Sequence, residues 1–240
     1  VLVGSAGADT LRGDGGDDVA YGGDGNDSVS GGIGNDSLYG GAGNDSLDGG
    51  EGGNLLDGGE GDDLLTASAS YYDYQYHWTT NTMLGGAGND TLIASQYTVN
   101  NVFDGGAGID GITGGSYADT YRFNLGNGID NVTETTGSLY PSLGLDTNDK
   151  IVMGAGIAPS DIAVYRSGNT LVFKHANGVD QLNVDNWFAG SRYYIETVEF
   201  ADGTVWNAAA LTAAALVVTG TEGNDVIGGT GMNDTLHGLG

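Results

Sequence analysis

The sequence contains no cysteine, so neither a disulfide scaffold nor a thiol nucleophile is available to it. Lysine and arginine together number 6 in 240 residues, against 32 aspartates and glutamates, which gives a formal net charge of −26. We expect no nucleic-acid partner, because phosphate recognition needs a basic face. No apolar run approaches the roughly 18 residues of a membrane-spanning helix, so no membrane span is expected.

Catalytic patterns are scarce as well. The three histidines, His77, His175 and His237, are widely scattered and have no spacing suited to zinc or to a nucleophile–base pair. No serine lies in a nucleophile elbow, and no glycine-rich stretch carries the lysine of a phosphate-binding loop. Carboxylates recur at repeat spacing, which favours metal binding over acid–base catalysis. The chain is therefore predicted not to be an enzyme, and no residue is predicted to be catalytic.

Glycine is abundant, with 47 residues, and it recurs in a nonapeptide. Residues 22–48 read GGDGNDSVS, GGIGNDSLY and GGAGNDSLD, which is the pattern G-G-x-G-x-D-x-U-x with U a large aliphatic residue. Seven such units run in register over residues 4–66. Glycines at positions 1, 2 and 4 permit a tight turn, and the last three residues alternate as a short strand does. Each nonapeptide is therefore predicted to be a turn followed by a strand.

Two units make one coil, so residues eighteen apart stack on the same edge. The aliphatic residues form a thin column between two parallel sheets, namely Leu11, Ala20, Val29, Leu38, Leu47, Leu56 and Leu65. One edge is predicted to carry Asp9, Asp27, Asp45 and Asp63, and the other Asp18, Asp36 and Asn54. A hard cation fits between successive acidic turns, because calcium accepts six to eight oxygen ligands at flexible geometry.

These repeats resemble those of the secreted RTX (repeats-in-toxin) family. The resemblance implies an all-β fold: a right-handed parallel β-roll that binds several Ca²⁺ ions. It also implies that positions 2, 4 and 6 of one loop and 1, 3 and 6 of the loop eighteen residues on supply the ligands. One ion would lie among Gly23, Gly25, Asp27, Gly40, Ala42 and Asp45, and the next, on the opposite edge, among Gly32, Gly34, Asp36, Gly49, Glu51 and Asn54. The Asn54 site is expected to be weaker, because it has lost one charge.

The full set of predicted metal ligands follows the same positions along the chain. In the first repeats they are Ser5, Gly7, Asp9, Asp14, Gly16, Asp18, Gly22, Gly23, Asp24, Gly25, Asp27, Gly31, Gly32, Ile33, Gly34, Asp36, Gly40, Gly41, Ala42, Gly43, Asp45, Gly49, Glu51, Asn54, Gly58, Glu60 and Asp63. Further on they are Gly86, Gly88, Asp90, Asn101, Gly105, Gly106, Ala107, Gly108, Asp110, Gly114, Ser116, Asp119, Asp130, Asp225 and Asp234.

The register is interrupted at residues 67–84 and 94–104, and Phe123-Asn124 is a further two-residue insertion. Residues 67–84 lack the motif but span the length of two nonapeptides, so they are predicted to be a degenerate coil or a bulging loop, with Asn81 at an aspartate position and Met83 in the core. Residues 94–104 are two residues over register, with Asn101 and Phe103 in the corresponding positions. The aromatics Tyr71, Tyr72, Tyr74, Tyr76 and Trp78 are either a contact surface for a glycan or protein partner or a cover over the break.

After residue 133 the composition changes. Residues 134–148 read as a linker or loop, and strand-like runs at 150–153, 162–166, 170–175, 179–184 and 194–200 predict antiparallel hairpins. The pieces GAGIAPSDIAVYRSGNTLVF, VDNWFAG and IETVEFADGTVW resemble the haemolysin-type calcium-binding-protein-related domain, which implies a small β-rich domain over 134–218. Its predicted core is Trp187, Phe188, Ile195, Val198, Phe200 and Trp206. Asn207 is expected to cap a helix from Ala208 to about Ala215.

Repeats restart over 219–240, with Asp225 and Asp234. Both ends of the sequence resemble interrupted repeats, so we expect a piece of a larger protein. One aliphatic side chain per nonapeptide is too little apolar burial to offset the ordering of nine residues, so folding is expected to require calcium.

Three hypotheses of function follow. The first is a calcium-dependent folding module of a secreted bacterial RTX protein, passed through a type I secretion channel and found outside the cell or on its surface. The second is an adhesin segment that uses the aromatics of 67–84. The third is the C-terminal accessory of a secreted protease, lipase or polysaccharide-modifying enzyme.

Overall fold

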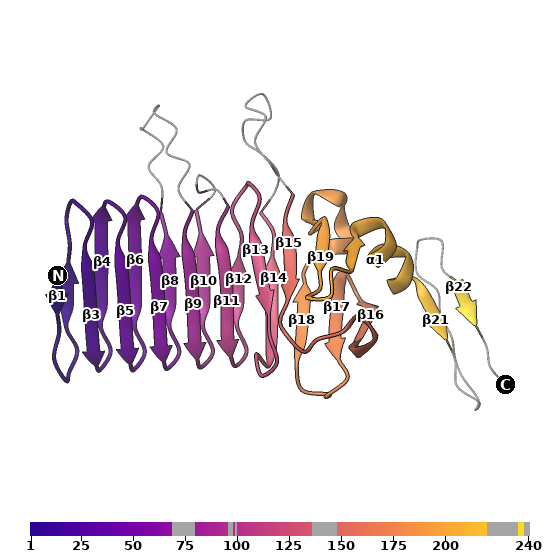
Figure 1. The fold of residues 1–240 in the computed structure, drawn as a ribbon, viewed down its shortest axis with the longest axis horizontal. Helices are drawn as coiled ribbons and strands as arrows, with labels where there is room; N and C mark the ends of the chain where they lie inside the picture. The colour runs from indigo at the N-terminus through magenta and orange to yellow at the C-terminus, as the bar shows by residue number, and fades with distance from the viewer. Residues whose placement is uncertain (69–79, 96–97, 99, 136–147, 220–234, 238–240) are drawn as a thin grey trace, which may run out of the picture.

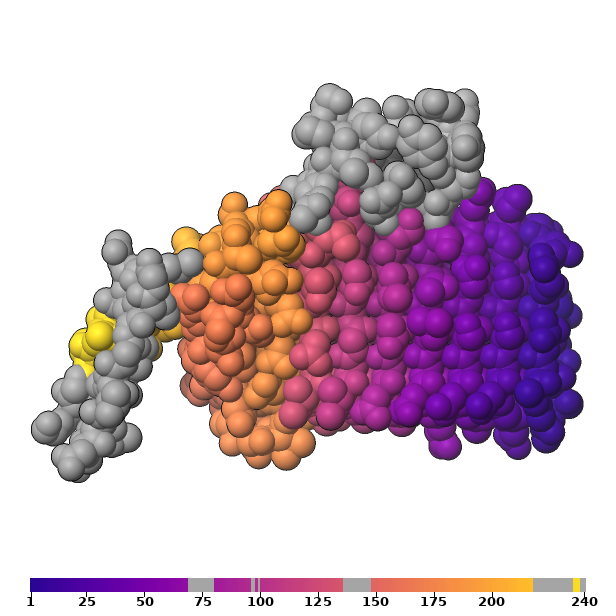
Figure 2. All heavy atoms as spheres, turned by 180° about the vertical axis from the view of Figure 1, so that it is seen from behind, coloured from indigo at the N-terminus to yellow at the C-terminus, as the bar shows by residue number. Residues whose placement is uncertain are grey.

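A computed structural model describes the chain except for residues 69–79, 96–97, 99, 136–147, 220–234 and 238–240. Two ten-stranded sheets run the length of an elongated body, and the coils succeed one another along its long axis (Figure 1). The space-filling view shows the first coils at one end and the C-terminal part at the other (Figure 2). In the described ranges no helix is long and apolar enough to cross a membrane.

The strands alternate between the two sheets as the chain advances. The first sheet contains, in spatial order, β1 (Leu2–Val3), β3 (Val19–Asp24), β5 (Ser37–Ala42), β7 (Leu55–Glu60), β9 (Thr82–Ala87), β11 (Val102–Ala107), β13 (Thr120–Phe123), β15 (Lys150–Met153), β19 (Thr197–Glu199) and β20 (Val205–Asn207). The second contains β2 (Thr10–Arg12), β4 (Ser28–Ile33), β6 (Ser46–Glu51), β8 (Leu64–Ala67), β10 (Thr91–Ala94), β12 (Gly111–Thr113), β14 (Ile129–Thr133), β18 (Gln181–Val184), β17 (Thr170–His175) and β16 (Ile162–Ser167).

Pairing within the repeats is parallel and obeys the predicted period. Leu38 in β5 pairs with Ala20 in β3 and with Leu56 in β7, eighteen residues away on either side. Nine residues therefore make a turn and a strand, and the predicted parallel β-roll is confirmed. The right-handed sense of its coiling stays a prediction.

The predicted aliphatic column is the core. Leu38, Leu47, Leu56 and Leu65 have no exposed surface, whereas Leu11, in the first coil, is only partly buried. The column continues on both sheets through Met83, Leu92, Phe103, Ile112, Tyr121, Val132, Ile151 and Val198. It includes two aromatic residues, and Phe103 stacks on Tyr121 with ring centroids 5.2 Å apart. The core column therefore runs unbroken from the repeats into the C-terminal part.

The strand pairing continues across the interruptions. Leu56 pairs directly with Met83, 27 residues on, so β7 and β9 are neighbours in the sheet, and the predicted degenerate coil or bulging loop at 67–84 falls mostly on residues 69–79, which lie outside the described residues. Met83 and Phe103 pair across 20 residues, and Tyr121 and Ile151 across 30. Loop closure entropy grows slowly with length, so insertions of this kind are tolerated at a turn.

Both sheets continue past residue 133. Antiparallel pairs join β16 to β17, β17 to β18, and β19 to β20, as the turn signals predict. The expectation of antiparallel hairpins is wrong for β15, which pairs in parallel with β13 on one side and with β19 on the other. It is also wrong for one side of β18, which pairs in parallel with β14. Turn residues predict where a strand ends. Whether that strand pairs in parallel or antiparallel depends on which other strand lies beside it, and here that strand is often far away in the sequence.

A cap of larger side chains closes the C-terminal end of the core. Trp187, Phe188, Ile195, Val198 and Phe200 are buried as predicted, and Trp206 is partly buried. Short 3₁₀ turns occur at Pro159–Asp161, Trp187–Ala189 and Ser191–Tyr193. Helix α1 (Ala208–Ala215) begins at Asn207, whose side chain accepts a hydrogen bond from the Ala210 amide at 2.9 Å, so the predicted cap is confirmed.

Repeats restart after the helix. Strand β21 (Val217–Thr219) pairs in parallel with β22 (Thr235–His237), at the eighteen-residue spacing of the first roll. Asp225 and Asp234 themselves lie outside the described residues.

Adjacent leucines in β8 provide a test of the column. Leu65 is fully buried and Leu64 is 40% exposed. Leu65→Ala is expected to lower the free energy of unfolding by about 2–5 kcal/mol, because it leaves a cavity in a spine one side chain thick. Leu64→Ala is the control, with an expected change of at most about 1 kcal/mol. Denaturant unfolding in saturating calcium measures both, and equal losses would contradict the column.

Candidate metal centre

The aspartates at position 6 of the repeats form a hydrogen-bonded ladder along one edge. The Asp27 amide donates to Oδ1 of Asp45 at 2.7 Å, and the Asp45 amide donates to Oδ1 of Asp63 at 2.7 Å. The same bond links Asp9 to Asp27, Asp63 to Asp90, Asp90 to Asp110, and, at 3.4 Å, Asp110 to Asp130. This edge, called edge one below, therefore carries seven aspartates in one line from Asp9 to Asp130.

The second carboxylate oxygen of these side chains is buried and has no hydrogen-bond partner. This holds for Oδ2 of Asp27, Asp45, Asp63, Asp90, Asp110 and Asp130 on edge one and of Asp36 on the other edge. A buried charged oxygen without a donor is strongly destabilising, and native structures seldom contain one. A row of such atoms at regular spacing indicates that a cation belongs beside them.

Burial acts on the pKa values of the same carboxyls. Desolvation raises the pKa of Asp63 to about 6 and that of Asp90 to about 7, and neighbouring aspartates add to both rises. The pKa values of Asp45 and Asp110 are raised for the same reason. Hydrogen bonds from the backbone oppose the shift but do not cancel it. The ladder therefore favours protons or cations over free negative charge.

The turns favour glycine at two of their positions. Gly41 and Gly43, at positions 2 and 4, have φ values of 119° and 128°, which disfavour residues with a Cβ. A Cβ on Gly41 would also collide with the carbonyl oxygen of Gly23 in the preceding coil. Asp14 fills position 2 of its repeat at φ 64°, a conformation that aspartate tolerates better than most residues. Main-chain carbonyls of successive coils thus crowd around each turn.

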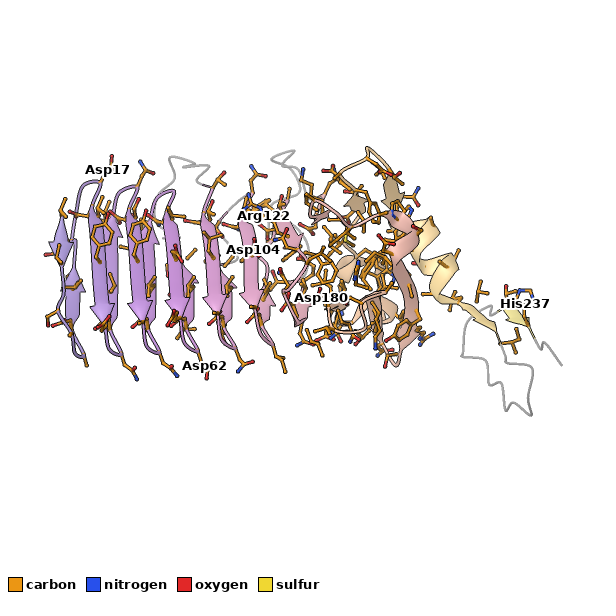
Figure 3. All side chains as sticks on the ribbon, turned by 60° about the horizontal axis from the view of Figure 1, so that its bottom comes forward. Asp17, Asp62, Asp104, Arg122, Asp180 and His237 are labelled. Carbon is orange, nitrogen blue, oxygen red and sulfur yellow. The ribbon has the colours of Figure 1, made fainter. Side chains whose placement is uncertain are left out.

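Peptide groups between coils are paired in part. The amide of Gly25 donates to the carbonyl of Ala42 at 2.6 Å, and that of Gly43 donates to the carbonyl of Glu60 at 2.7 Å. A carbonyl oxygen has two lone pairs, so the position-3 carbonyls keep acceptor capacity. Outside the metal-facing line, a second ladder of Asn and Asp at position 5 joins the coils, as where Asn44 donates through its amide to Oδ1 of Asn26 at 3.0 Å. Figure 3 shows Asp17 and Asp62, two residues of this position, on opposite edges of the roll.

This donor set fits calcium. Carboxylate and carbonyl oxygens are the ligands of a hard cation, and closely spaced glycine turns bring enough of them together for a coordination number of six to eight. In the described turns no nitrogen or sulfur side chain faces the unpaired Oδ2 atoms closely enough to hydrogen bond with them. Calcium therefore matches the line of unpaired oxygens both in its positive charge and in its preference for oxygen ligands.

The opposite edge, called edge two, carries a mixed ladder. The Asp18 amide donates to Oδ1 of Asp36, and the Asp36 amide donates to Oδ1 of Asn54, each at 2.8 Å. The ladder continues through Asn81 and Asn101 to Asp119, Asp149 and Glu196. Beyond Asp36, edge two therefore has three amide side chains before carboxylates return.

The carboxylates that follow the three asparagines on edge two form a buried cluster near the end of the repeats. Ligand oxygens of Asp119, Glu134 and Asp149 all lie within 4.8 Å of one another, and all three residues are buried. The Tyr121 hydroxyl donates to Oε1 of Glu134, and the Asp149 amide donates to Glu196 at 2.8 Å. Burial, with help from neighbouring carboxylates, raises the pKa of Glu134 to about 8 and that of Asp149 to about 10. The cluster can hold a metal ion or protons, but not three free charges.

Sequence reasoning missed Glu134, Asp149 and Glu196. A signal was present for two of them, because Asp149 and Glu196 directly precede the triplets Lys-Ile-Val and Thr-Val-Glu, whose middle residues enter the core column. They occupy position 6 of units that have lost their glycines. Asp180 was also missed: its carboxylate accepts the amides of Gly126 and Gly128, at 3.0 Å each, and closes the last turn of edge one.

The remaining predicted ligands divide by location. The position-3 side chains of Asp24, Ile33 and Glu60 are exposed, so only their carbonyls are available to the coil interior. Gly114 lies against the hydroxyl of Tyr121, and its carbonyl accepts a hydrogen bond from Thr135 at 3.1 Å. Oδ2 of Asp9 accepts bonds from the Ser5 amide and hydroxyl. The aromatics Tyr71, Tyr72, Tyr74, Tyr76 and Trp78 lie outside the described residues.

Raised pKa values make a signed prediction for the calcium-free chain. Asp63 and Asp90 titrate near 3.8 when unfolded but at about 6 and about 7 in the roll, so their contribution to stability is present below about pH 4 and is lost as the pH rises through about 6 to 7. The folded fraction in calcium-free buffer is expected to fall between about pH 5 and about pH 8. In saturating calcium the trend is expected to reverse, because ligands must lose their protons. Circular dichroism across this range measures both, and a calcium-free roll that gains structure with rising pH would contradict the assignment.

Comparisons with known proteins place the same segments in known families. The model of the RTX calcium-binding nonapeptide repeat matches residues 1–29, 30–65, 78–96 and 217–240. The model of the haemolysin-type calcium binding protein related domain matches residues 171–210. No curated protein matches the chain.

Among solved structures, the crystal structure of the extracellular lipase LipA from Serratia marcescens is similar at 20% sequence identity and a TM-score of 0.38. The similarity covers 76% of this chain and 37% of the lipase chain. The chain therefore spans well under half the length of that protein.

Proposed function

This chain carries RTX calcium-binding nonapeptide repeats together with a haemolysin-type calcium-binding-protein-related domain, and from that premise we propose that it is a module whose folding is controlled by calcium. The observation that carries the proposal is the line of buried, unpaired Oδ2 atoms from Asp27 to Asp130. Bound calcium would supply the positive charge that these oxygens lack. The role is one of binding rather than catalysis.

The proposed sites lie between successive turns of edge one. Each would take the position-6 carboxylates of two adjacent coils, such as Asp27 and Asp45, with main-chain carbonyls of their glycine turns. On edge two, the unpaired Oδ2 of Asp36 supports one further site, next to Asn54. Without ions, the ionised carboxylates of successive coils would repel one another along the edge. This repulsion adds to the burial that raises the pKa values of Asp63 and Asp90. The roll therefore depends on calcium most strongly where the unpaired oxygens are most deeply buried.

A calcium-dependent fold suits a secreted protein. Members of the RTX family are typically secreted, and extracellular modules bind calcium at about 10⁻⁴–10⁻³ M. We place this chain outside a bacterial cell or at its surface, after passage through a type I secretion channel in an unfolded state. Low calcium inside the cell would keep the acidic turns apart, and external calcium would bring them together.

We further propose that the segments act as one folding unit. Residues 1–133 form the roll, 134–218 the domain that closes it, and 219–240 the start of a second roll. Support comes from the strands of the closing domain, because β15 and β18 pair directly with β13 and β14 of the roll. Order in the closing domain would then be linked to calcium binding in the repeats.

Adjacent aspartates in one turn provide the test. Asp63→Asn keeps the oxygen that accepts the Asp45 amide but removes a charge from a buried, unpaired position. It is expected to raise the calcium concentration at half-folding by about tenfold. The matched control is Asp62→Asn at the exposed neighbouring position, where an amide oxygen can still accept the Asn89 amide.

A calcium titration followed by far-ultraviolet circular dichroism gives the midpoint for the wild type and both variants. Wild-type protein with the same spectrum in excess chelator and in calcium would refute calcium-controlled folding. Equal midpoints for Asp63→Asn and Asp62→Asn would remove Asp63 from the sites.

A further inference from the structure

We propose that the middle of edge two is free of metal, and that the side-chain amides of Asn54, Asn81 and Asn101 occupy the space that calcium takes on edge one. The inference rests on the proposed calcium-binding function, because it assigns which turns bind ions and which do not. It concerns three successive turns of the same roll, each stacked on the next.

The first observation is the difference in unpaired atoms between the two edges. Asn81 and Asn101 are as deeply buried as Asp90 and Asp110, their counterparts at position 6 on edge one. Each of these two aspartates keeps one unpaired Oδ2, whereas none of the three asparagines has a buried side-chain atom without a partner. The two kinds of side chain are thus equally buried, but only the asparagines have all their buried polar atoms hydrogen bonded without a cation.

The partners of the asparagines explain this completeness. Nδ2 of Asn81 donates to Oδ1 of Asn101 at 3.0 Å, and Nδ2 of Asn101 donates to Oδ1 of Asp119 at 2.8 Å. Nδ2 of Asn101 also donates to the Thr98 hydroxyl at 3.0 Å. The side-chain oxygens of Asn54 and Asn81 accept main-chain amides of the preceding coil, as the aspartates of edge one do, whereas that of Asn101 accepts the side-chain amide of Asn81. An asparagine therefore makes the ladder bond with its oxygen and supplies a donor where an aspartate leaves a bare acceptor.

The turn at Asn54 shows the replacement most directly. Its Nδ2 donates to the carbonyl oxygens of Gly50 and Gly52, at 3.4 Å and 3.3 Å. These are the carbonyls at positions 2 and 4 of its own glycine turn. The bonds are long, but the amide lies in the centre of the turn and directs its hydrogens at the oxygens a cation would need. A calcium ion between the turns of Asn54 and Asn81 would have to displace a neutral donor that is already hydrogen bonded, whereas the site proposed at Asp36 lies on the other side of Asn54.

The sequence before Asn81 and Asn101 points the same way. The five residues that precede Asn81 read Tyr-His-Trp-Thr-Thr, and the five before Asn101 read Gln-Tyr-Thr-Val-Asn, without a single glycine. These sequences lack the glycines that, in the regular repeats, let carbonyls of adjacent coils approach closely. Asparagine thus replaces aspartate in the two turns that carry the interruptions of the repeat. Asp119 completes the series, because both its oxygens accept protein donors, from Asn101 and from Gly115.

Two residues of neighbouring turns make a matched pair for the test. Asn81→Ala removes an amide from edge two, and Asp90→Ala removes a carboxylate at position 6 on edge one; both side chains are at least 99% buried. Bound calcium per chain is counted by equilibrium dialysis and atomic absorption on the full chain, and a thermal midpoint is recorded in saturating calcium. Circular dichroism in calcium first verifies that each variant folds, and Asn101→Ala replaces Asn81→Ala if the latter does not.

Asn81→Ala is expected to bind the same number of ions as the wild type and to melt at a lower temperature, because it loses only hydrogen bonds. Asp90→Ala is expected to lose about one ion or more per chain, because its carboxylate faces both adjacent turns. Asn81→Asp is expected to gain no ion. Loss of an ion in Asn81→Ala, or gain of one in Asn81→Asp, would overturn the proposal. Absence of bound calcium in the wild type would instead refute the proposed function, so the two failures are distinguishable.

Discussion

One hydrogen bond, repeated along both edges, holds this structure in register: the main-chain amide of a position-6 residue donates to the side-chain oxygen of the position-6 residue in the next coil. Between Asn81 and Asn101 the side-chain amide is the donor instead. The bond needs only an acceptor of the right reach. Aspartate, asparagine and glutamate all provide it, as Asp45, Asn54 and Glu196 show. It fixes the spacing between coils, and every other contact between turns follows from that spacing.

The cost of using aspartate for this bond is the oxygen that remains. A carboxylate stacked in a buried line has a second oxygen that no backbone amide reaches, and along edge one those oxygens accumulate from Asp27 to Asp130. Burial, with the neighbouring aspartates, raises the pKa of Asp63 to about 6 and that of Asp90 to about 7, so ionising these carboxyls is unfavourable. A chain that needed only stability would place asparagine at each position. Under the proposed function, the aspartates of edge one make stability conditional on a cation.

The strictly periodic part of the fold was predictable from sequence because a period of nine fixes both the strand and its neighbour. Leu38 and Leu56 could be placed in the core, and Asp27 beside Asp45, from spacing alone. The two interruptions lengthen the pairing distance from 18 residues to 27 and 20, but Met83 and Phe103 keep their predicted positions in the core. Whether residues 67–84 form a coil or a loop could not be decided in this way, because both preserve the register.

Prediction failed where the glycine turn is lost but the stack continues. Asp149 follows Asp119 by 30 residues and Glu196 follows Asp149 by 47, so no period connects them, and only the alternation of the strands that follow remains as a signal. Glu134 was missed for a different reason: it is drawn in by the hydroxyl of Tyr121, which lies in the core column and needs a partner there. Neither the spacing of carboxylates nor the repeat motif carries that information.

The same tyrosine lies close to the end of the repeats, in the core column. A stack of identical coils would leave an open edge on both sheets, and open edges invite association with other chains. Here the core column is continuous with Trp187 and Phe188, which lie beside strands that have turned antiparallel. Strands β16 and β20 end the two sheets, and helix α1 follows directly after β20. The change from repeats to an apolar cap therefore takes place within one continuous core, because β15 and β18 pair directly with β13 and β14 of the roll.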